Sequence, residues 1–340
     1  MAWTPGGAAS AADLVALQRG QLTLEHLALV AGSVRRVIAA RVAHTPSGVE
    51  VCDDGGMSDQ RTALVLGGGG ITGIAWEIGV LAGLADAGVD LASADLVVGT
   101  SAGSVVGAQV TAGADLEAMF ARQLEPPAQE KVARMSRSNL ARYAWAMLVS
   151  RGRDEDFRRR VGSVALAAEK AGLTPTELER LDVIGSRLVG REWPDRQLVV
   201  TAVDAETGEF HPFDRTSGVP LLQAVAASCA VPGVYPPVTI DERRYIDGGM
   251  RSTANADLAQ GYDRLVVLAP IPRGVGPIAS VDAQVTGMVS ARVAVVTPDD
   301  GARKAIGKNV LDPAARAPAA RAGRAQAAEA VERIADAWTG

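Results

Sequence analysis

Short apolar runs alternate along the chain with longer segments in which apolar residues recur every three or four positions. The runs at residues 62–66 and 95–99 have the length of buried strands. Helical spacing follows each of them, over about 74–87 and 102–111. Strands that alternate with helices are typical of a parallel sheet with helices on its faces. We therefore expect an α/β protein with three α/β/α layers and a mainly parallel central sheet.

The rest of the chain continues this pattern after one long interruption. Residues 115–191 have helical spacing almost throughout, which predicts a helical insertion that forms a cap or a side layer. Strand patterns then return, and Ala205–Gly208 has the composition of a tight turn between two of them. The other expected elements are hairpins at 196–213 and 236–249, a helix at 221–230, strands at 264–270 and 291–298, and a C-terminal helix at about 316–338.

The N-terminal 56 residues differ in pattern from the rest of the chain. A strand pattern begins almost directly after Met57. We therefore expect one domain over residues 57–340, with Met57 as an alternative start and 1–56 as an extension that is not native. Residues 22–42 have amphipathic helical spacing, so a genuine N-terminal helix is the alternative.

Composition limits the classes of function. The chain has 340 residues, 48% of them hydrophobic, and a formal net charge of -5, as expected for a globular protein with a large core. Its 34 basic residues are interspersed with 39 acidic ones, which argues against a nucleic-acid partner. The two cysteines, Cys52 and Cys229, are too few for a disulfide framework. Without a membrane-spanning run or a secretory signal, we expect a cytoplasmic protein.

Four consecutive glycines, Gly67–Gly70, separate the first strand from the first helix. Such a run suits a place where bare backbone must approach a phosphate or an oxyanion closely. Gly68, Gly70 and Gly73 match the G-x-G-x-x-G pattern of dinucleotide sites. However, the second strand ends without the carboxylate that would hold a ribose, and no P-loop lysine follows the glycines. A nucleotide-binding protein is therefore the weaker alternative.

The second strand ends in "GTSAG", a G-x-S-x-G match at a strand-to-helix junction. A sharp turn there would expose the hydroxyl of Ser101, and Gly99 and Gly103 would relieve the crowding around it. The following helix would point its positive end at this serine. In a parallel sheet the glycine run would lie beside the turn, so its amides could stabilise the oxyanion of an acyl-transfer reaction. We therefore expect a nucleophilic serine.

The base that activates this serine is restricted by the histidine count. The last of the three histidines is His211, so the order serine, aspartate, histidine is impossible. The base is then His211 or a carboxylate. Asp247 lies at the end of a predicted strand and precedes two glycines that allow a tight turn. Asp204 and Asp241 have the positions of hairpin residues.

Four motifs, "GGGGITG", "GTSAG", "AVAASCAVPGVYPPV" and "YIDGG", resemble in order and spacing the patatin-like phospholipases and acyl hydrolases. The resemblance covers about residues 61–270. It implies a Ser-Asp dyad without histidine, with Ser101 as nucleophile and Asp247 as base. The oxyanion donors that it implies are Gly68, Gly69 and Gly70. The family usually has Arg or Lys where this chain has Thr72, which puts the head-group preference in doubt.

The expected function is hydrolysis of fatty-acyl esters of lipids through an acyl-enzyme intermediate. A transacylase that passes the acyl group to another alcohol would use the same intermediate and is the alternative. We expect no cofactor, and no metal, because the chain lacks a D-x-D-x-D-G calcium loop. The expected partner is a lipid or ester substrate.

Residues 139–153 combine aromatic, methionine and leucine residues with flanking arginines. This composition fits a helix that makes a peripheral contact with a membrane. We favour the alternative, in which Tyr143, Trp145, Met147 and Leu148 pack the insertion onto the sheet, because such residues at helical spacing usually belong to the core.

Overall fold

The computed structural model describes residues 60–126 and 132–339. The chain separates into two units, Met1–Met57 and Ser58–Gly340, and the described residues belong to the second. The expectations for residues 1–56, the alternative start at Met57 and Cys52 lie outside the described residues.

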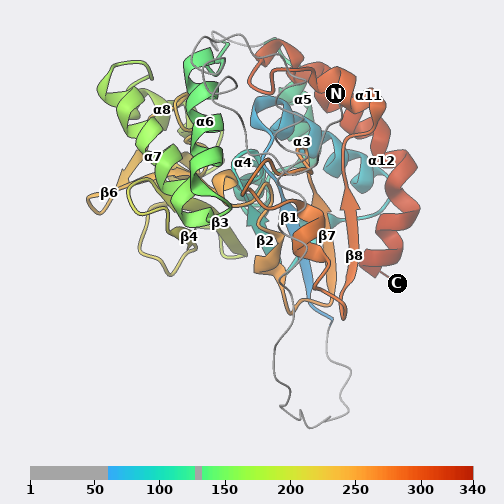
Figure 1. The fold of residues 1–340 in the computed structure, drawn as a ribbon. Coiled ribbons are helices and arrows are strands. Elements are labelled where there is room, and N and C mark those ends of the chain that lie inside the picture. The colour runs from blue at the N-terminus through green and yellow to red at the C-terminus, as the bar shows by residue number, and fades with distance from the viewer. Residues whose placement is uncertain (1–59, 127–131, 340) are drawn as a thin grey trace, which may run out of the picture. The chain divides into compact units, whose positions relative to one another are not determined.

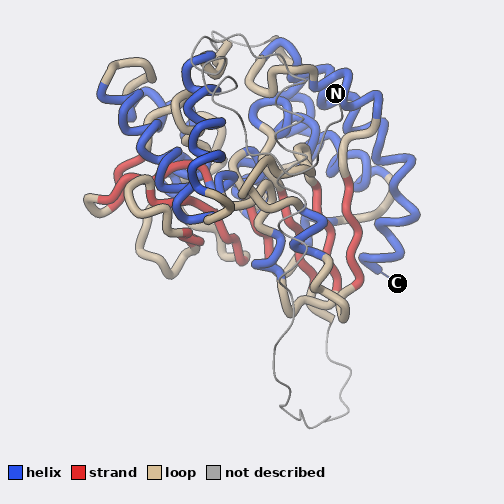
Figure 2. The backbone as a smooth tube through the Cα atoms, viewed as in Figure 1, coloured by secondary structure: helices blue, strands red, loops and turns tan. Residues whose placement is uncertain are grey.

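A mixed sheet forms the centre of the described unit, and Figure 2 shows its strands side by side with helices around them. The strands follow the order β5-β6-β3-β2-β1-β7-β8, and β4 pairs with β3 outside this path. Five strands, β1, β2, β3, β7 and β8, are parallel, whereas β4, β5 and β6 form antiparallel pairs. The bounds are β1 Thr62–Leu66, β2 Leu96–Gly99, β3 Gln197–Asp204, β4 Phe210–Phe213, β5 Val238–Ile240, β6 Arg243–Asp247, β7 Arg264–Leu268 and β8 Arg292–Val296.

Helices cover both faces of this sheet, so the expected α/β class with three layers and a mainly parallel sheet is confirmed (Figure 1). Apolar strand residues such as Leu64 and Val97 pack with α3, α4, α9 and α12. On the opposite face, Val203 and Ile246 pack with α6 and α7. The helices are α3 Gly70–Asp86, α4 Ala102–Thr111, α5 Leu116–Leu124, α6 Arg137–Ser150, α7 Asp154–Lys170, α8 Glu177–Gly185, α9 Leu221–Ser228, α10 Val281–Val285, α11 Asp300–Ile306 and α12 Arg316–Thr339.

The helical insertion is divided between the two faces instead of forming one cap or one side layer. Its helices α5 and α8 pack against α3 and α9, and Ile184 of α8 enters the main core. Its helices α6 and α7 form a separate core, in which Phe157 and Val161 are fully buried. The apolar stripes of the four helices therefore fit different surfaces, although one periodic pattern runs through all of them.

The first helix begins inside the glycine run, four residues before its expected start. Gly69 is its N-cap, and Gly70 has a φ of +61°, a value that glycine adopts without strain. Spacing of apolar residues could not reveal this turn, because glycines contribute no periodic signal.

The pairing of β3 with its neighbours brings the carboxyl ends of β2 and β6 together. Val200 pairs with both β2 and β4, so these two strands lie on opposite edges of β3. Ala202 pairs with both β4 and Asp247 of β6, which places β6 on the same edge as β2. Since β6 is antiparallel to β3 and β2 is parallel to it, the carboxyl ends of β2 and β6 face each other.

The register of β6 is set by the turn that joins it to β5. Asp241 and Glu242 occupy this turn, with φ values of +47° and +66°. Positive φ at both central residues is typical of the type I′ turn that matches the twist of a two-residue hairpin. The predicted hairpin at 236–249 is therefore present, and Asp241 is a turn residue as expected.

Within the part of the chain that the structure describes, every helix is too short or too polar to cross a bilayer.

Candidate active site

Ser101 lies at a strained turn between β2 and α4. Its φ of +52° is uncommon for a residue with a side chain, and it is the N-cap of α4. A Cβ at Gly99 would lie 2.6 Å from the Cα of Ser104, and one at Gly103 would collide with the carbonyl oxygen of Leu66. Both glycines of the G-x-S-x-G match are thus required by backbone packing around the serine.

Residues of α9 and its C-cap form hydrogen bonds with the main chain of this turn. The amide of Ser101 donates to the hydroxyl of Ser228 at 2.9 Å, and the thiol of Cys229 donates to the Ser101 carbonyl at 3.2 Å. Burial raises the pKa of Cys229 to about 11, so the thiol keeps the proton that it donates. Both residues lie in the motif "AVAASCAVPGVYPPV", but no sequence pattern indicated their contact with the serine turn.

The glycine loop lies against the serine, and Gly68 is its nearest part. A Cβ at Gly68 would be 3.6 Å from the Cβ of Ser101, and the Gly68 amide already donates to the Thr253 carbonyl at 2.7 Å. The amides of Gly69 and Gly70 donate to no described residue. A Cβ at Gly69 would lie 2.5 Å from Pro270. Bare backbone is therefore required here, and the available donors lie one and two residues beyond Gly68.

Asp247 ends β6 and is 3% exposed. Its carboxylate accepts a hydrogen bond at 2.8 Å from the Gly249 amide, and the Ser101 side chain lies close enough to lower the pKa of this carboxyl group by hydrogen bonding. Burial raises the pKa of Asp247 from 3.8 to about 6, although these hydrogen bonds and the charge of Arg180 act in the opposite direction. The structure thus brings Ser101 and Asp247 together in a largely desolvated place.

A buried hydrogen-bond network joins the serine turn to the loop after Asp247. The side-chain amide of Asn255 donates to the hydroxyl of Thr100 at 3.0 Å and to the carbonyl of Gly248 at 3.3 Å. Thr201 of β3 donates to the same Thr100 hydroxyl at 3.0 Å. Since all these groups are buried and paired, the network fixes the distance between the two chain segments. No sequence signal identified Asn255.

Arg180 of α8 supplies a positive charge to the small cavity at Ser101. It is 7% exposed, and its guanidinium lies over the ring of Tyr235, 3.7 Å from the centroid. Both residues line a small cavity of about 20 Å³ together with Ser101. Thr72 instead bonds to the carbonyl of Val310 through both its amide and its hydroxyl. The cation at this site therefore comes from the insertion, a source that the sequence pattern did not reveal.

His211 does not lie at the serine. It is on β4, two strand spacings from Asp247, and its ring contacts those of Phe213 and Tyr245. None of its described contacts is with Ser101. Asp204 caps the hairpin turn by accepting from the amides of Glu206 and Thr207, as its position predicted.

The helix α6 combines both roles that were considered for residues 139–153. Tyr143 is 8% exposed and packs with the core under α6. Trp145 and Leu148, which we expected to pack the insertion onto the sheet, are 55% and 46% exposed. The expectation was wrong for Trp145 and Leu148, because the buried stripe of α6 consists of Asn139, Tyr143, Ala146 and Ser150. Leu140 is 55% exposed as well.

These features define an α/β protein with a serine at a strained strand-to-helix turn and a buried carboxylate next to it. The model of the patatin-like phospholipase family matches residues 64–259, more than half of the chain. The chain therefore belongs to the patatin-like phospholipase family, which is in the general class of lipid acyl hydrolases.

Two kinds of relatives match by sequence. An uncharacterised NTE family protein of Mycobacterium bovis is 30% identical over 235 residues, which are 69% of this chain and 50% of that protein. The lysophospholipase nte1 of Aspergillus niger is 27% identical over 213 residues, 62% of this chain and 12% of that protein. The matched part thus spans half or less of these relatives.

Two solved structures are similar in fold at low identity. VipD from Legionella pneumophila aligns with 81% of this chain and 67% of its own, at 13% identity and a TM-score of 0.40. The type III effector protein ExoU aligns with 81% of this chain and 53% of its own, at 15% identity and a TM-score of 0.37.

Proposed function

We propose that this protein hydrolyses fatty-acyl esters of lipids, with Ser101 as nucleophile and Asp247 as general base. The observation that carries the proposal is the proximity of the Ser101 side chain to the buried Asp247 carboxylate, close enough for Ser101 to lower the pKa of this carboxyl group by hydrogen bonding. The two residues are 146 positions apart in the chain, and they have the chemistry of a nucleophile and a base. The family match and a relative named lysophospholipase support the choice of a lipid ester as substrate.

The reaction would proceed in two steps through an acyl-enzyme. Asp247 accepts the proton of Ser101 as the serine oxygen attacks the ester carbonyl, and then gives this proton to the leaving alcohol. Water, deprotonated by the same carboxylate, then releases the fatty acid. A pKa raised to about 6 by burial makes Asp247 a stronger base than an exposed aspartate, yet leaves it mostly ionised at pH 7.

The oxyanion would be stabilised by backbone amides and by a cation. The amides of Gly69 and Gly70 are the donors that we assign from the glycine loop, with Gly68 as the residue that sets their distance from the serine. We assign the Ala102 amide, at the start of α4, as a further donor, because Ala102 also lines the small cavity. Each such donor contributes about 3 kcal/mol to the transition state. Arg180 adds long-range stabilisation.

Access to lipid would be provided by a peripheral contact of α6 with a membrane. Residues 132–153 contain five arginines and no acidic residue. Leu140, Trp145 and Leu148 are exposed within this segment. Exposed apolar residues with flanking positive charge favour an anionic lipid surface. The helix also contacts the loop beside the serine, because Asn139 donates to the Gly233 carbonyl at 2.8 Å.

Two substitutions test the dyad on the purified protein. Ser101→Ala should abolish labelling by a fluorophosphonate probe, and Asp247→Asn should reduce hydrolysis of p-nitrophenyl esters by about a thousandfold or more. Matched controls are Ser163→Ala and Asp182→Asn, because both side chains are exposed on helices outside the site. Labelling that persists in Ser101→Ala would exclude this nucleophile. Analysis of products with glycerol present separates hydrolysis from transfer to an alcohol.

A further inference from the structure

We propose that a second cavity, next to the serine, binds the phosphate of the substrate's head group through Arg122, Arg187 and Arg316. This inference rests on the proposed function. The cavity has a volume of about 300 Å³, and three of its lining residues, Ile71, Ile74 and Arg187, also line the small cavity at Ser101. The two cavities are thus neighbours, and Arg187 lines both.

The position of the second cavity suits a group a few bonds away from the reacting ester. Val105 and Gln109 line it, four and eight residues beyond Ser101 in the chain. At the rise of an α-helix they lie about 6 and 12 Å from the serine along α4. In a glycerophosphate ester, only a three-carbon glycerol unit and one oxygen separate the phosphorus from the ester oxygen. The phosphorus would therefore lie at the end of the cavity nearer to Ser101.

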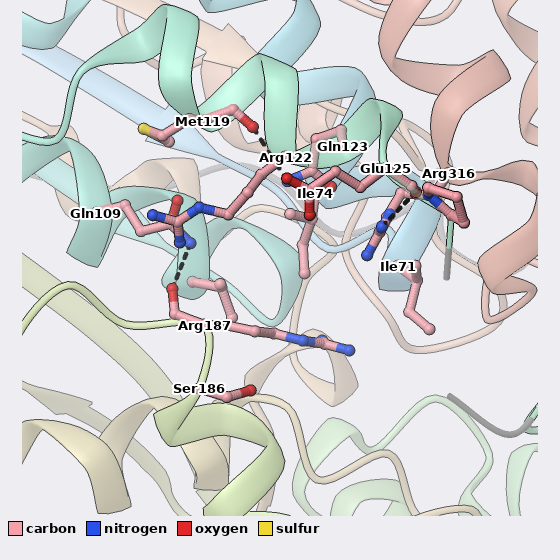
Figure 3. Close-up of a pocket in the computed structure, with 12 residues that line it drawn as sticks. Ile71, Ile74, Gln109, Met119, Arg122, Gln123, Glu125, Ser186, Arg187 and Arg316 are labelled. Carbon is pink, nitrogen blue, oxygen red and sulfur yellow. Dashed lines mark hydrogen bonds between the residues drawn. The ribbon is translucent and has the colours of Figure 1, made fainter. Parts of the chain in front are cut away.

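The charges of the lining favour an anion. Three arginines and one glutamate, Glu125, face a single cavity in a protein whose formal net charge is -5. They come from separate elements: Arg122 from α5, Arg187 from the segment after α8, and Arg316 from the start of α12 (Figure 3). Guanidinium groups that share a cavity repel one another, and a phosphate removes this repulsion by accepting paired hydrogen bonds.

Hydrogen bonds hold two of the three arginines at the cavity. The main-chain carbonyl of Arg187 accepts a hydrogen bond from the side chain of Gln109 at 2.6 Å, and Figure 3 shows the Arg187 side chain extending across the cavity toward Ile71. Arg316 donates through one terminal nitrogen to the carbonyl of Glu125 at 2.8 Å. Its buried Nε has no hydrogen-bond partner among the described residues. These two hydrogen bonds fix the main chain of Arg187 and one end of the Arg316 guanidinium at the cavity.

The lining also argues against the other parts of a lipid. Polar side chains, including Gln109, Gln123 and Ser186, would leave an acyl chain in contact with groups that need hydrogen bonds. None of the described lining residues is aromatic, whereas quaternary ammonium groups are commonly bound in aromatic cages. We therefore assign the cavity to a phosphate monoester, as in an acylated glycerol phosphate, in preference to a phosphocholine.

A pair of substrates that differ only in the phosphate tests this assignment. The wild-type protein should favour 1-oleoylglycerol 3-phosphate over 1-oleoylglycerol when the ratio of their kcat/KM values is measured in the same mixed micelles. Arg187→Gln and Arg316→Gln should each lower this ratio by about tenfold, as expected for one lost charge-assisted hydrogen bond. Arg333→Gln is the matched control, since Arg333 is exposed on α12 away from the cavity, and should keep the ratio. An unaltered ratio in both cavity variants would overturn the assignment.

Binding measurements separate failure of this inference from failure of the proposed function. Glycerol 3-phosphate should bind the Ser101→Ala protein by calorimetry, and Arg187→Gln in that background should weaken the binding. If the wild-type protein is not labelled by a fluorophosphonate and cleaves neither ester, the proposed function fails, whereas this binding still decides the anion site. If inorganic phosphate binds as tightly as glycerol 3-phosphate and the wild type has no preference between the esters, the cavity is a site for free phosphate, and the head-group assignment is wrong.

Discussion

The two sides of the candidate active site differ in whether backbone or side chains shape them. On one side, the glycine loop and the turn at Ser101 are shaped by backbone packed against backbone, and side chains are excluded. On the other side, α8 and the loop at 231–235 present long side chains, of which Arg180 and Tyr235 are in direct contact. The first side has almost no freedom to vary in sequence, whereas the second can exchange one side chain for another. Chemistry is therefore expected to depend on the first side, and charge preference on the second.

The backbone side should be the more sensitive to a single added methyl group. Gly103→Ala would force its Cβ into the Leu66 carbonyl, so the Ser101 turn must shift. We expect ester hydrolysis to fall by about a hundredfold or more, since a displacement of the nucleophile by 1 Å has this effect. Initial rates with a soluble p-nitrophenyl ester and thermal unfolding would measure it. Gly190→Ala is the control, because its Cβ would meet no atom within 4 Å. Equal activity of the two variants would contradict the backbone argument.

Loss of the cation on the other side should have a smaller effect. Arg180→Gln removes a buried charge that lowers the pKa of Asp247 and lines the same small cavity as Ser101. We expect kcat/KM to fall by about tenfold at pH 7. The acid limb of the pH profile should also move to higher pH, because the pKa of Asp247 rises when the positive charge is removed. Arg180→Lys should restore part of both properties, and a profile that does not move would exclude this electrostatic role.

The pH dependence of the wild-type protein tests whether a buried Asp247 acts as the base. Asp247 must be ionised to accept a proton, and burial raises its pKa to about 6. Activity should therefore be complete above pH 7 and decline as the pH falls through 6, by about tenfold for each unit below it. The log of kcat/KM for a soluble ester, plotted against pH, would check this. A limb near pH 4 would indicate an aspartate whose burial does not affect it.

The smallest effect is expected at the surface, outside both sides of the site. Trp145→Glu places a negative charge on the exposed face of α6, among arginines. Co-sedimentation with vesicles that contain phosphatidylglycerol should decrease about threefold or more, since both apolar contact and charge attraction are weakened. Val289→Glu, at a residue 94% exposed, is the matched control. Similar co-sedimentation of wild type and Trp145→Glu would exclude α6 as the contact.

The sequence was most informative where a local pattern and a structural need coincide. Gly99, Ser101 and Gly103 were recognisable because five adjacent residues make one crowded turn. The alternation of strand and helix patterns predicted the sheet and its class for the same reason, since both periodicities are local. Asp247 could be proposed as the base from the histidine count and from the family resemblance. How it reaches Ser101 depends on strand order, which a single sequence does not reveal.

Contacts between distant segments could not be predicted from the sequence. Ser228, Cys229 and Asn255 act on a turn that lies more than a hundred positions away in the chain. Arg180 and Arg187 lie in a helical segment with no distinguishing pattern, and only the packing of α8 against α9 brings them to the site. The start of α3 was missed because glycines do not contribute to periodicity. Each of these features follows from tertiary packing rather than from local propensity.

The hairpin turn at Asp241 and Glu242 has an effect far beyond its size. The turn fixes which residues of β5 and β6 are opposite each other, and β6 in turn pairs with β3 up to Asp247. A slip of β6 by one residue along β3 would turn the Asp247 carboxylate to the other face of the sheet. A slip of two residues would carry it about 7 Å away from the serine. The position of the proposed proton acceptor therefore depends on the register of a short strand whose other end is held by a two-residue turn.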